Sequence, residues 1–416
     1  MKLSDQNRWI YTGIIAVAIA AAAAIGLSVI MMADDGRNGS LNTVQGGAAG
    51  EEDLFPHKAY PKHAKGFSIE YHGTYKVLSI HDPWGRADEN YTYLLVQRGE
   101  EVPAGYPDAQ VFSVPIQSAV TLGVVHLTQI SQLEELHTVK GHNGVALVYD
   151  EEIHRLAEEG SIREIGGGGM AMTPTLKMEE MIELEPDVVF CTANGNREYD
   201  NQYKLREAGL KPVVTAGWME DHPLARAEWI KFIAYFYNRE GEANDLFDGV
   251  AANYSAISAK TRDLTPKPTV FSGFNYQGTW YAPGGGSYVA MLFKDAGADY
   301  ILLNDTERGD QPLDFEVVYE RAHDADYWIN IGIAGDVHEL LALEPRYAKF
   351  DAFKSGNLYH HDARVSPNGG DDYWQSGILR PDIVLADLVK IVHPEVLPDH
   401  ELYYYNHISS PQEGAV

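Results

Sequence analysis

Aromatic, amide and basic side chains follow several predicted strands, and these residue types suit the binding of a large, partly apolar ligand. In an α/β fold, ligands lie at the loops after the carboxyl ends of strands. Trp and Tyr rings fit the faces of such a ligand, and Arg fits its carboxylate or catecholate charge. The residues at these positions are His126, Asn194, Arg197, Trp218, Tyr276, Trp280, Tyr281, Tyr288, Asn330, Arg364 and Trp374.

These residues also have a purely structural interpretation. The chain contains 7 Trp and 25 Tyr, so some aromatic rings fall near any strand end by composition. Core packing is an equally good role for each ring, and His126 fits a buried structural histidine. His360 and His361 are neighbours in a predicted strand and point to opposite faces, so a shared metal ion is not expected. We predict no metal site and no resident cofactor.

The sequence lacks a convincing catalytic motif. The run Gly166–Gly169 loosely fits a dinucleotide-binding loop, but Thr173-Pro174 interrupts the helix that should follow it. The pair His338-Glu339 lacks the second histidine of a zinc-protease motif. The single cysteine, Cys191, lies in an apolar run and is expected to be a buried, inert thiol. The pattern favours a binding protein over an enzyme.

The charge of the chain excludes one class of partner. The 32 basic and 60 acidic residues give a formal net charge of −28. Phosphate would repel so acidic a surface, and nucleic acid is therefore not an expected partner.

Strands alternate with helices in two series, which predicts two α/β lobes. The first series includes predicted strands at 119–125, 145–149, 187–191 and 212–215. The stretch 224–262 reads as one long helix, with Gly241 as a weak point, and roughly 35 residues would span about 50 Å. We therefore predict two Rossmann-like α/β lobes, 67–222 and 266–408, joined by a bridging helix at 223–265. The ligand cleft would lie between the lobes, and 409–416 would be a tail. The sequence does not assign a function to residues 67–110.

The N-terminus predicts a membrane segment. Residues 9–33 contain no Asp, Glu, Lys or Arg, and 25 residues in a helix are long enough to cross a bilayer. Lys2 and Arg8 precede this segment and acidic residues follow it, which places residues 1–8 in the cytoplasm and the remainder outside. An uncleaved anchor is favoured, with a cleaved signal as the alternative. Because no cysteine follows the apolar run, a bacterial lipoprotein anchor is not expected. Residues 34–66 read as a flexible tether.

Five stretches carry a resemblance to a known family. The chain resembles the class III binding proteins, which deliver siderophores, haem and cobalamin to ABC importers. The resemblance covers roughly residues 67–405, and Met178 and Glu185 depart from the family pattern. The stretches are 176–189, 227–232, 284–302, 313–318, and Arg380-Pro381-Asp382 together with 390–395.

The resemblance implies a function and two docking residues. It implies a monomeric substrate-binding protein that captures an iron complex and delivers it to a permease with its ATPase. By motif position, Glu179 and Glu316 would dock onto permease arginines through charge-assisted pairs, with Glu180 as the alternative if the register shifts by one. Both residues also fit first helical turns, where the helix dipole favours Glu. A haem or corrinoid receptor and an extracytoplasmic chelate-processing enzyme are the alternative functions.

Overall fold

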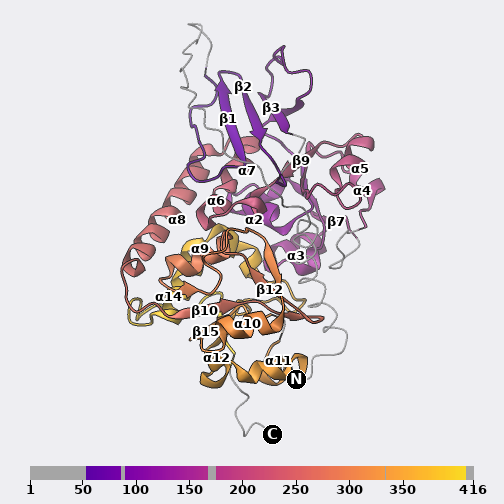
Figure 1. The fold of residues 1–416 in the computed structure, drawn as a ribbon. Coiled ribbons are helices and arrows are strands. Elements are labelled where there is room, and N and C mark those ends of the chain that lie inside the picture. The colour runs from indigo at the N-terminus through magenta and orange to yellow at the C-terminus, as the bar shows by residue number, and fades with distance from the viewer. Residues whose placement is uncertain (1–52, 86–89, 167–174, 333, 409–416) are drawn as a thin grey trace, which may run out of the picture.

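The computed structural model describes residues 53–85, 90–166, 175–332 and 334–408. Figure 1 shows an N-terminal lobe above a C-terminal lobe, with a separate β-sheet at the top of the molecule. Each lobe contains a largely parallel sheet with helices packed against it. The predicted α/β fold with two lobes is therefore confirmed.

The sheet of the N-terminal lobe is parallel throughout and has the order β7-β6-β5-β8-β9. This is the doubly wound order 3-2-1-4-5. The chain adds strands on one side of β5 first and on the other side afterwards, so the switch point of the sheet lies between β5 and β8. The strands are β5 (Ala119–Thr121), β6 (Val139–His142), β7 (Arg163–Glu164), β8 (Val188–Thr192) and β9 (Pro212–Thr215). The helices of this lobe are α2 (Val124–Gln132), α3 (Glu151–Glu158), α4 (Met178–Glu183) and α5 (Gln202–Glu207).

One predicted strand of this lobe is wrong. Residues Val145–Leu147 form a 3-10 helix, and the strand that precedes it is β6. The helix begins after Gly144, whose φ is 86°. The Glu164 carboxylate accepts hydrogen bonds from the backbone N–H groups of Gly144 and Val145, at 3.0 and 2.8 Å. These bonds satisfy the start of a helical turn, which an apolar pattern alone does not reveal.

The C-terminal lobe has a second five-stranded sheet in the order β13-β10-β15-β16-β17, in which only β17 is antiparallel. Its direction reverses between β10 and β15. The strands are β10 (Thr269–Ser272), β13 (Asp299–Tyr300), β15 (Tyr327–Ile329), β16 (Leu358–His360) and β17 (Asn406–His407). The helices are α9 (Tyr288–Asp295), α10 (Phe315–Ala322), α11 (Val337–Leu343), α12 (Asp351–Ser355), α13 (Ser376–Leu379) and α14 (Pro381–Val392). A small antiparallel sheet adds β11 (Phe274–Tyr276), β12 (Thr279–Pro283) and β14 (Asp310–Leu313).

The predicted single bridging helix is wrong, because the segment forms three helices. These are α6 (Pro223–Ala227), α7 (Trp229–Tyr237) and α8 (Glu240–Thr261). The break before α8 lies at Asn238, whose φ of 56° places it in the left-handed region. Asparagine adopts this conformation more readily than other non-glycine residues, so Asn238 ends the helix three residues before Gly241. Figure 1 shows α8 alone running along the side of the molecule from the N-terminal lobe toward the C-terminal lobe.

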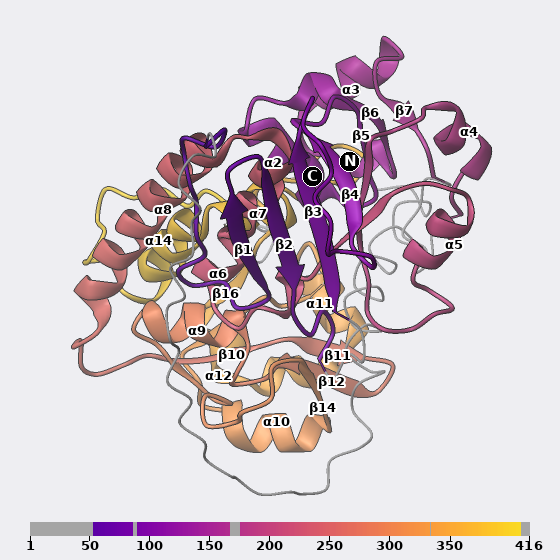
Figure 2. The same cartoon turned by 90° about the horizontal axis from the view of Figure 1, so that it is seen from above.

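Helix α7 is a core helix, and all nine of its residues are buried. Phe232 and Phe236 make edge contacts with Tyr93 and Phe112 on one side, and Phe236 contacts Phe190 of β8 on the other. An apolar surface all round a helix requires cover on every side. Here the cover comes from two different sheets, and Figure 2 shows β1–β4 lying over α7.

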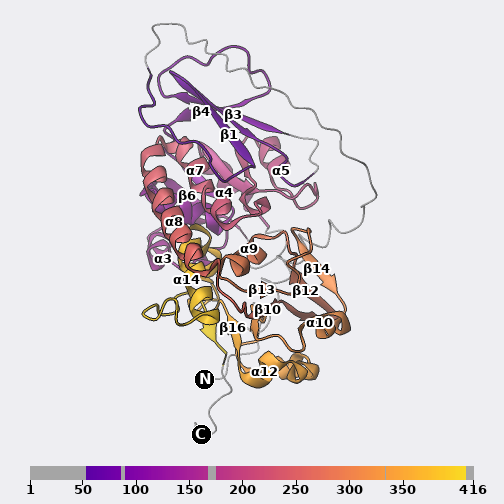
Figure 3. The same ribbon diagram turned by 60° about the vertical axis from the view of Figure 1, so that its left-hand side comes forward.

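The upper sheet, which we call the N-terminal sheet, has the order β1-β2-β3-β4. The first three strands are antiparallel, and β4 is parallel to β3. In Figure 3 this sheet lies at the end of the molecule remote from α10 and α12. Its strands are β1 (Phe67–His72), β2 (Tyr75–Ile80), β3 (Tyr91–Gln97) and β4 (Gln110–Val114).

The predicted tether is too long, because its last part packs on the folded body. Phe55 and Ala59 are buried. The fully buried carboxylate of Glu228 accepts hydrogen bonds from the backbone N–H groups of residues 62–64, at 2.6 to 2.9 Å. Glu220 accepts two more from residues 65 and 66, both at 2.9 Å. These bonds cross more than 150 residues of sequence, so local composition could not reveal them.

The predicted anchor at 9–33 and the predicted tail at 409–416 lie outside the described residues. Among the residues that the structure describes, no helix is long and apolar enough to cross a membrane.

We expect replacement of Asp310 by asparagine to stabilise the protein at alkaline pH. Burial raises the pKa of Asp310 from 3.8 to about 6, so folding favours the protonated carboxyl. That stability is present below pH 4 and is lost as pH rises through 6. Asp310→Asn should therefore raise the free energy of unfolding by about 1–3 kcal/mol at pH 8 and by little at pH 3.5, as measured by urea denaturation. Equal gains at the two pH values would contradict this assignment.

Candidate functional site

Each lobe has one topological switch point, where the connections that follow two neighbouring strands run to opposite sides of the sheet. Ligands of doubly wound folds bind there. In the N-terminal lobe this point lies between β5 and β8, and Asn194 is the second residue after β8. In the C-terminal lobe it lies between β10 and β15, and Asn330 directly follows β15. The structure therefore places two predicted ligand residues at the two positions that topology favours.

The loop after β8 is held in one conformation by a buried carboxylate. Asp200 is 3% exposed and accepts hydrogen bonds from the backbone N–H groups of Asn194 and Gly195, at 2.9 and 3.0 Å. The Asn194 side-chain oxygen accepts a further bond from the Asn196 N–H at 2.9 Å. A loop with these internal bonds presents fixed groups to a ligand.

Asn330 is held in an unusual conformation. Its φ is 61°, and its backbone N–H donates to the Tyr359 carbonyl at 2.9 Å. Its side-chain oxygen is buried and has no hydrogen-bond partner among the described residues. Left-handed backbone outside glycine and unpaired buried polar atoms both gather at functional sites.

Arg226, on α6, has the contacts that most clearly indicate a ligand-binding position. Its guanidinium carbon lies 3.9 Å from the ring centroid of Tyr288, which is the first residue of α9 in the C-terminal lobe. The Nε and Nη1 atoms of Arg226 are buried and have no partner within the described part of the chain. Leaving such donors unpaired costs about 1–3 kcal/mol each. A guanidinium with free, enclosed donors is suited to a bidentate anion such as a carboxylate.

Two buried tyrosines extend this site. Tyr373 and Tyr405 are 3% and 2% exposed, and their ring centroids lie 5.9 Å apart. Burial raises the pKa of both hydroxyls, although nearby Arg226 partly offsets the effect at Tyr373. The side chain of Asn330 lies near the Tyr405 hydroxyl and slightly opposes this rise of its pKa. Both hydroxyls are therefore neutral at physiological pH. We call Arg226, Tyr288, Asn330, Tyr373 and Tyr405 the interlobe cluster.

The end of β16 borders the interlobe cluster. The His361 ring stacks on Tyr373 at 4.2 Å, and its Nδ1 lies 2.9 Å from the Asp371 carboxylate. Burial lowers the pKa of His360 well below its usual value, so this ring is neutral. In the described ranges, no group of three or more His, Cys, Asp or Glu side chains is arranged to hold a metal ion.

The lobes also touch at a second place beside this cluster. The Gln375 side chain accepts from the Tyr149 N–H at 2.9 Å and donates to the Leu147 carbonyl at 3.0 Å. The Arg364 guanidinium lies 4.7 Å from the Tyr149 ring centroid and donates to Asp372 at 2.7 Å. These contacts set the spacing of the lobes near the cluster.

The structure brings together some of the predicted ligand residues and separates others. Tyr288 and Asn330 belong to the interlobe cluster, and Trp374 borders it with its ring 5.0 Å from that of Tyr373. Arg364 lies at the neighbouring contact between lobes. Arg197 is exposed and stacks on Tyr203 at 4.7 Å. Three further predicted residues are half-buried and lie outside the interlobe cluster: Trp218 after β9, Tyr276 in β11 and Tyr281 in β12.

Two predicted ligand residues lie in the protein core. Trp280 is fully buried and donates its indole N–H to the Ser272 carbonyl at 3.1 Å. His126 is 3% exposed, and its Nε2 lies 2.6 Å from the Thr215 hydroxyl. Burial lowers the pKa of His126 to about 3, so the ring is neutral. In the described conformation these side chains fill the core, which is the structural interpretation that their sequence positions also allowed.

Sequence reasoning missed Arg226, Tyr373 and Tyr405. Arg226 lies in the helical stretch that we treated only as a connection, so no strand-end pattern marked it. The run Tyr403-Tyr404-Tyr405 after the last helix was a usable signal, because three consecutive aromatic residues beyond a domain's final helix need a reason.

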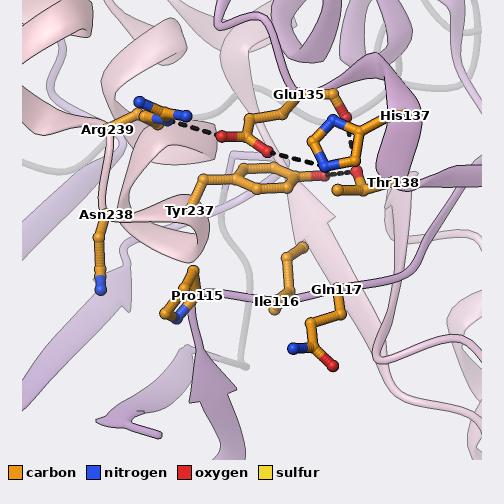
Figure 4. A pocket seen from close by; sticks show the side chains of 9 residues that line it. All are labelled: Pro115, Ile116, Gln117, Glu135, His137, Thr138, Tyr237, Asn238 and Arg239. Atoms are coloured by element: carbon orange, nitrogen blue, oxygen red, sulfur yellow. Dashed lines mark hydrogen bonds and ion pairs between the residues drawn. The ribbon is translucent and has the colours of Figure 1, made fainter.

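A cavity of 460 Å³ lies at the opposite end of the N-terminal lobe, next to the amino ends of β5 and β6. Figure 4 shows that several of its polar side chains pair with one another, with Glu135 between Arg239 and His137, and Thr138 beside Tyr237. The carboxyl ends of the strands are the ligand side of such a sheet. We therefore assign the ligand site to the interlobe cluster rather than to this cavity.

The two predicted docking residues are both accessible. Glu179 is exposed in the first turn of α4. Glu316 lies in the first turn of α10 with its side chain 77% exposed, and it forms an ion pair with Arg346 at 2.9 Å. Figure 1 shows α4 in the upper lobe and α10 in the lower one.

Comparison with known families identifies the fold. The sequence pattern described as "Periplasmic binding protein" matches residues 166–365, which contain the interlobe-cluster residues Tyr288 and Asn330. In this part of its sequence the chain is similar to periplasmic binding proteins. Because this family consists of binding proteins, the prediction of a binding protein rather than an enzyme is confirmed.

Two relatives match most of the chain in sequence. The chain is 29% identical over 329 residues to an uncharacterized lipoprotein of Methanocaldococcus jannaschii, and the match covers 75% of each chain. A second uncharacterized lipoprotein of that organism is 29% identical over 324 residues, covering 75% of this chain and 79% of the relative.

Solved structures share the fold. A possible iron-binding (periplasmic solute-binding) protein from Staphylococcus epidermidis superposes with a TM-score of 0.51 at 18% identity. A periplasmic heme-binding protein from Roseiflexus sp. RS-1 gives 0.52 at 20% identity. In both comparisons 67% of this chain covers 99% of the other, so this chain has parts beyond the shared fold.

Proposed function

We propose that this chain is the substrate-binding protein of an ABC importer and that its ligand is an anionic iron complex, such as a ferric siderophore or haem. It would act outside the cytoplasmic membrane, held there by its N-terminal segment, and deliver the complex to a permease. The lipoprotein names of its relatives and the periplasmic family support this location.

The observation that carries the proposal is the stacked pair of Arg226 and Tyr288 in the interlobe cluster. The pair joins the helix after the N-terminal lobe to the first turn of α9, so it lies where the lobes meet. Free guanidinium donors would bind a carboxylate or catecholate oxygen of the ligand. Neighbouring aromatic rings would contact its apolar faces.

Solved structures with this fold include iron-binding and heme-binding proteins, which supports an iron complex as the ligand class. A ligand that brings its own organic shell around the metal requires anion donors and aromatic surface from the protein. The interlobe cluster supplies both kinds of group.

We further propose that Glu179 and Glu316 dock the loaded protein onto the permease. One residue lies on each lobe, both in first helical turns, and both side chains reach solvent. Two separate points of contact would report the distance between the lobes. Carboxylate pairs with permease arginines would also speed the encounter.

The test is a fluorescence titration of the full chain in detergent with haemin, ferric enterobactin, ferrichrome and cyanocobalamin. We expect saturable one-to-one binding of at least one iron complex. Replacing Arg226 by glutamine should weaken that binding about 10- to 100-fold, because a charge-assisted bond is worth about 1.5–3 kcal/mol. Arg226→Lys should recover only part of the loss, since lysine lacks the bidentate fork.

The matched control is Arg239→Gln, which removes a guanidinium at the other end of the lobe, where it pairs with Glu135. This variant should bind like the wild type. Binding by Arg226→Gln at wild-type strength would refute its role in anion binding. If the chain bound only cyanocobalamin, the ligand would be a corrinoid and not an iron complex. A folded chain that binds none of the four compounds would refute the proposed ligand class.

A further inference from the structure

The N-terminal sheet reaches the ligand side of the N-terminal lobe through one short segment after β2. Trp84 packs directly on Gly195, in the loop that follows β8. A Cβ atom on Gly195 would lie 2.7 Å from both the Cδ1 and Nε1 atoms of Trp84, so no other residue fits there without displacing the indole. Gly195 also has a φ of 85°, which favours glycine. The contact is therefore close and specific.

The next residue makes a second contact of the same kind. A Cβ atom on Gly85 would lie 3.3 Å from the Cε atom of Met219, in the turn that follows β9. Trp84 and Gly85, in the connection from β2 to β3, thus lie beside the loops after two neighbouring strands. These loops carry Asn194 and Trp218, which the sequence predicted as ligand contacts.

The segment is supported by a rigid base. The Tyr93 hydroxyl of β3 is buried and accepts a hydrogen bond from the Val214 N–H of β9 at 2.8 Å. The Tyr91 ring, also in β3, lies 6.1 Å from the Trp84 ring in an edge contact. The N-terminal sheet is therefore fixed to the N-terminal lobe at the strand that borders the ligand loops.

We propose that Trp84 is a specificity-determining residue, which presents an aromatic wall to the ligand at the switch point between β5 and β8. One part of the indole covers Gly195, and the side chain keeps part of its surface exposed. An indole in this place stacks on aromatic or macrocyclic ligand faces. The inference rests on the proposed function and gives the N-terminal sheet a role in ligand choice.

The experiment titrates the full chain with haemin and ferric enterobactin, which carry aromatic rings, and with ferrichrome, whose iron-binding groups are hydroxamates. Trp84→Leu keeps an apolar side chain on Gly195 but removes the π face, and Trp84→Phe keeps a ring. We expect Trp84→Leu to weaken binding of the aromatic probes about tenfold and to change ferrichrome binding less than twofold. Trp84→Phe should stay within about threefold of the wild type.

The matched control is Tyr106→Ala, which removes a half-buried ring from the connection between β3 and β4, where it contacts Tyr75 of β2. It should bind all probes like the wild type, and thermal melting should show that every variant is folded. An equal loss for all three probes in Trp84→Leu would show a merely structural role and overturn the inference. Unchanged binding in Trp84→Leu, or a wild type that binds ferrichrome alone, would also overturn it while the proposed function stands. A wild type that binds none of the probes would overturn both.

Discussion

Cells in which both Glu179 and Glu316 are replaced by arginine are expected to lose uptake of the iron chelate, although the purified variant binds the chelate like the wild type. Each reversal places like charges opposite each other at the docking surface, and such pairs cost several kcal/mol. The two positions lie on separate lobes and away from the interlobe cluster, so ligand binding should not change. The measurements are uptake of radiolabelled iron chelate by intact cells and titration of the purified full chain.

The control is the double variant Glu183→Arg with Glu320→Arg, which reverses the same charges elsewhere on the same two helices. Both glutamates are exposed, and Glu183 pairs with exposed Arg163 at 3.1 Å. Surface pairs of this kind contribute about 0–1 kcal/mol to stability. Normal uptake in the control and none in the docking variant would support the assignment. Normal uptake in the docking variant would refute it.

Replacing Lys76 by methionine is expected to lower the free energy of unfolding by about 3–5 kcal/mol, because it leaves a buried carboxylate unpaired. The Lys76 ammonium donates to the Tyr235 carbonyl, the Asn238 side chain and the Glu240 carboxylate, at 2.6, 2.9 and 2.7 Å. Lys76 and Glu240 are 0% and 2% exposed. Burial lowers the pKa of Lys76 to about 8 even though Glu240 opposes this shift. The ammonium therefore joins the N-terminal sheet to the break between α7 and α8.

Urea denaturation of two further variants distinguishes this account from simple loss of side-chain packing. The double variant Lys76→Met with Glu240→Leu removes both charges and should recover most of the lost stability. Lys62→Met removes an exposed lysine paired with Asp248 and should cost less than about 1 kcal/mol. A Lys76→Met variant that loses no more stability than Lys62→Met would contradict the importance of the buried pair.

The alternation of strands and helices in both lobes follows from the sequence, whereas the 3-10 helix at Val145–Leu147 and the helix break at Asn238 do not. Alternating apolar runs and amphipathic stretches depend on local periodicity, so the strands at Val188–Thr192 and Pro212–Thr215 could be predicted within one residue. The rule that ligands bind after carboxyl strand ends also selected Asn330, which directly follows β15, and its ligand role stays a prediction. Both inferences depend only on short stretches of chain.

Which side chains face one another across long sequence distances depends on the tertiary fold, and local sequence patterns do not reveal it. Trp280 and Asn330 both follow the strand-end rule, yet aromatic packing buries the first while the left-handed backbone of the second keeps its side chain in the interlobe cluster. Arg226 gained its role because α6 lies against α9, and no local pattern encodes that contact. Glu228 likewise holds residues 62–64, which looked like a tether, through bonds across some 165 residues. The interaction energies of buried charges and rings depend on residues that become neighbours only when the chain folds.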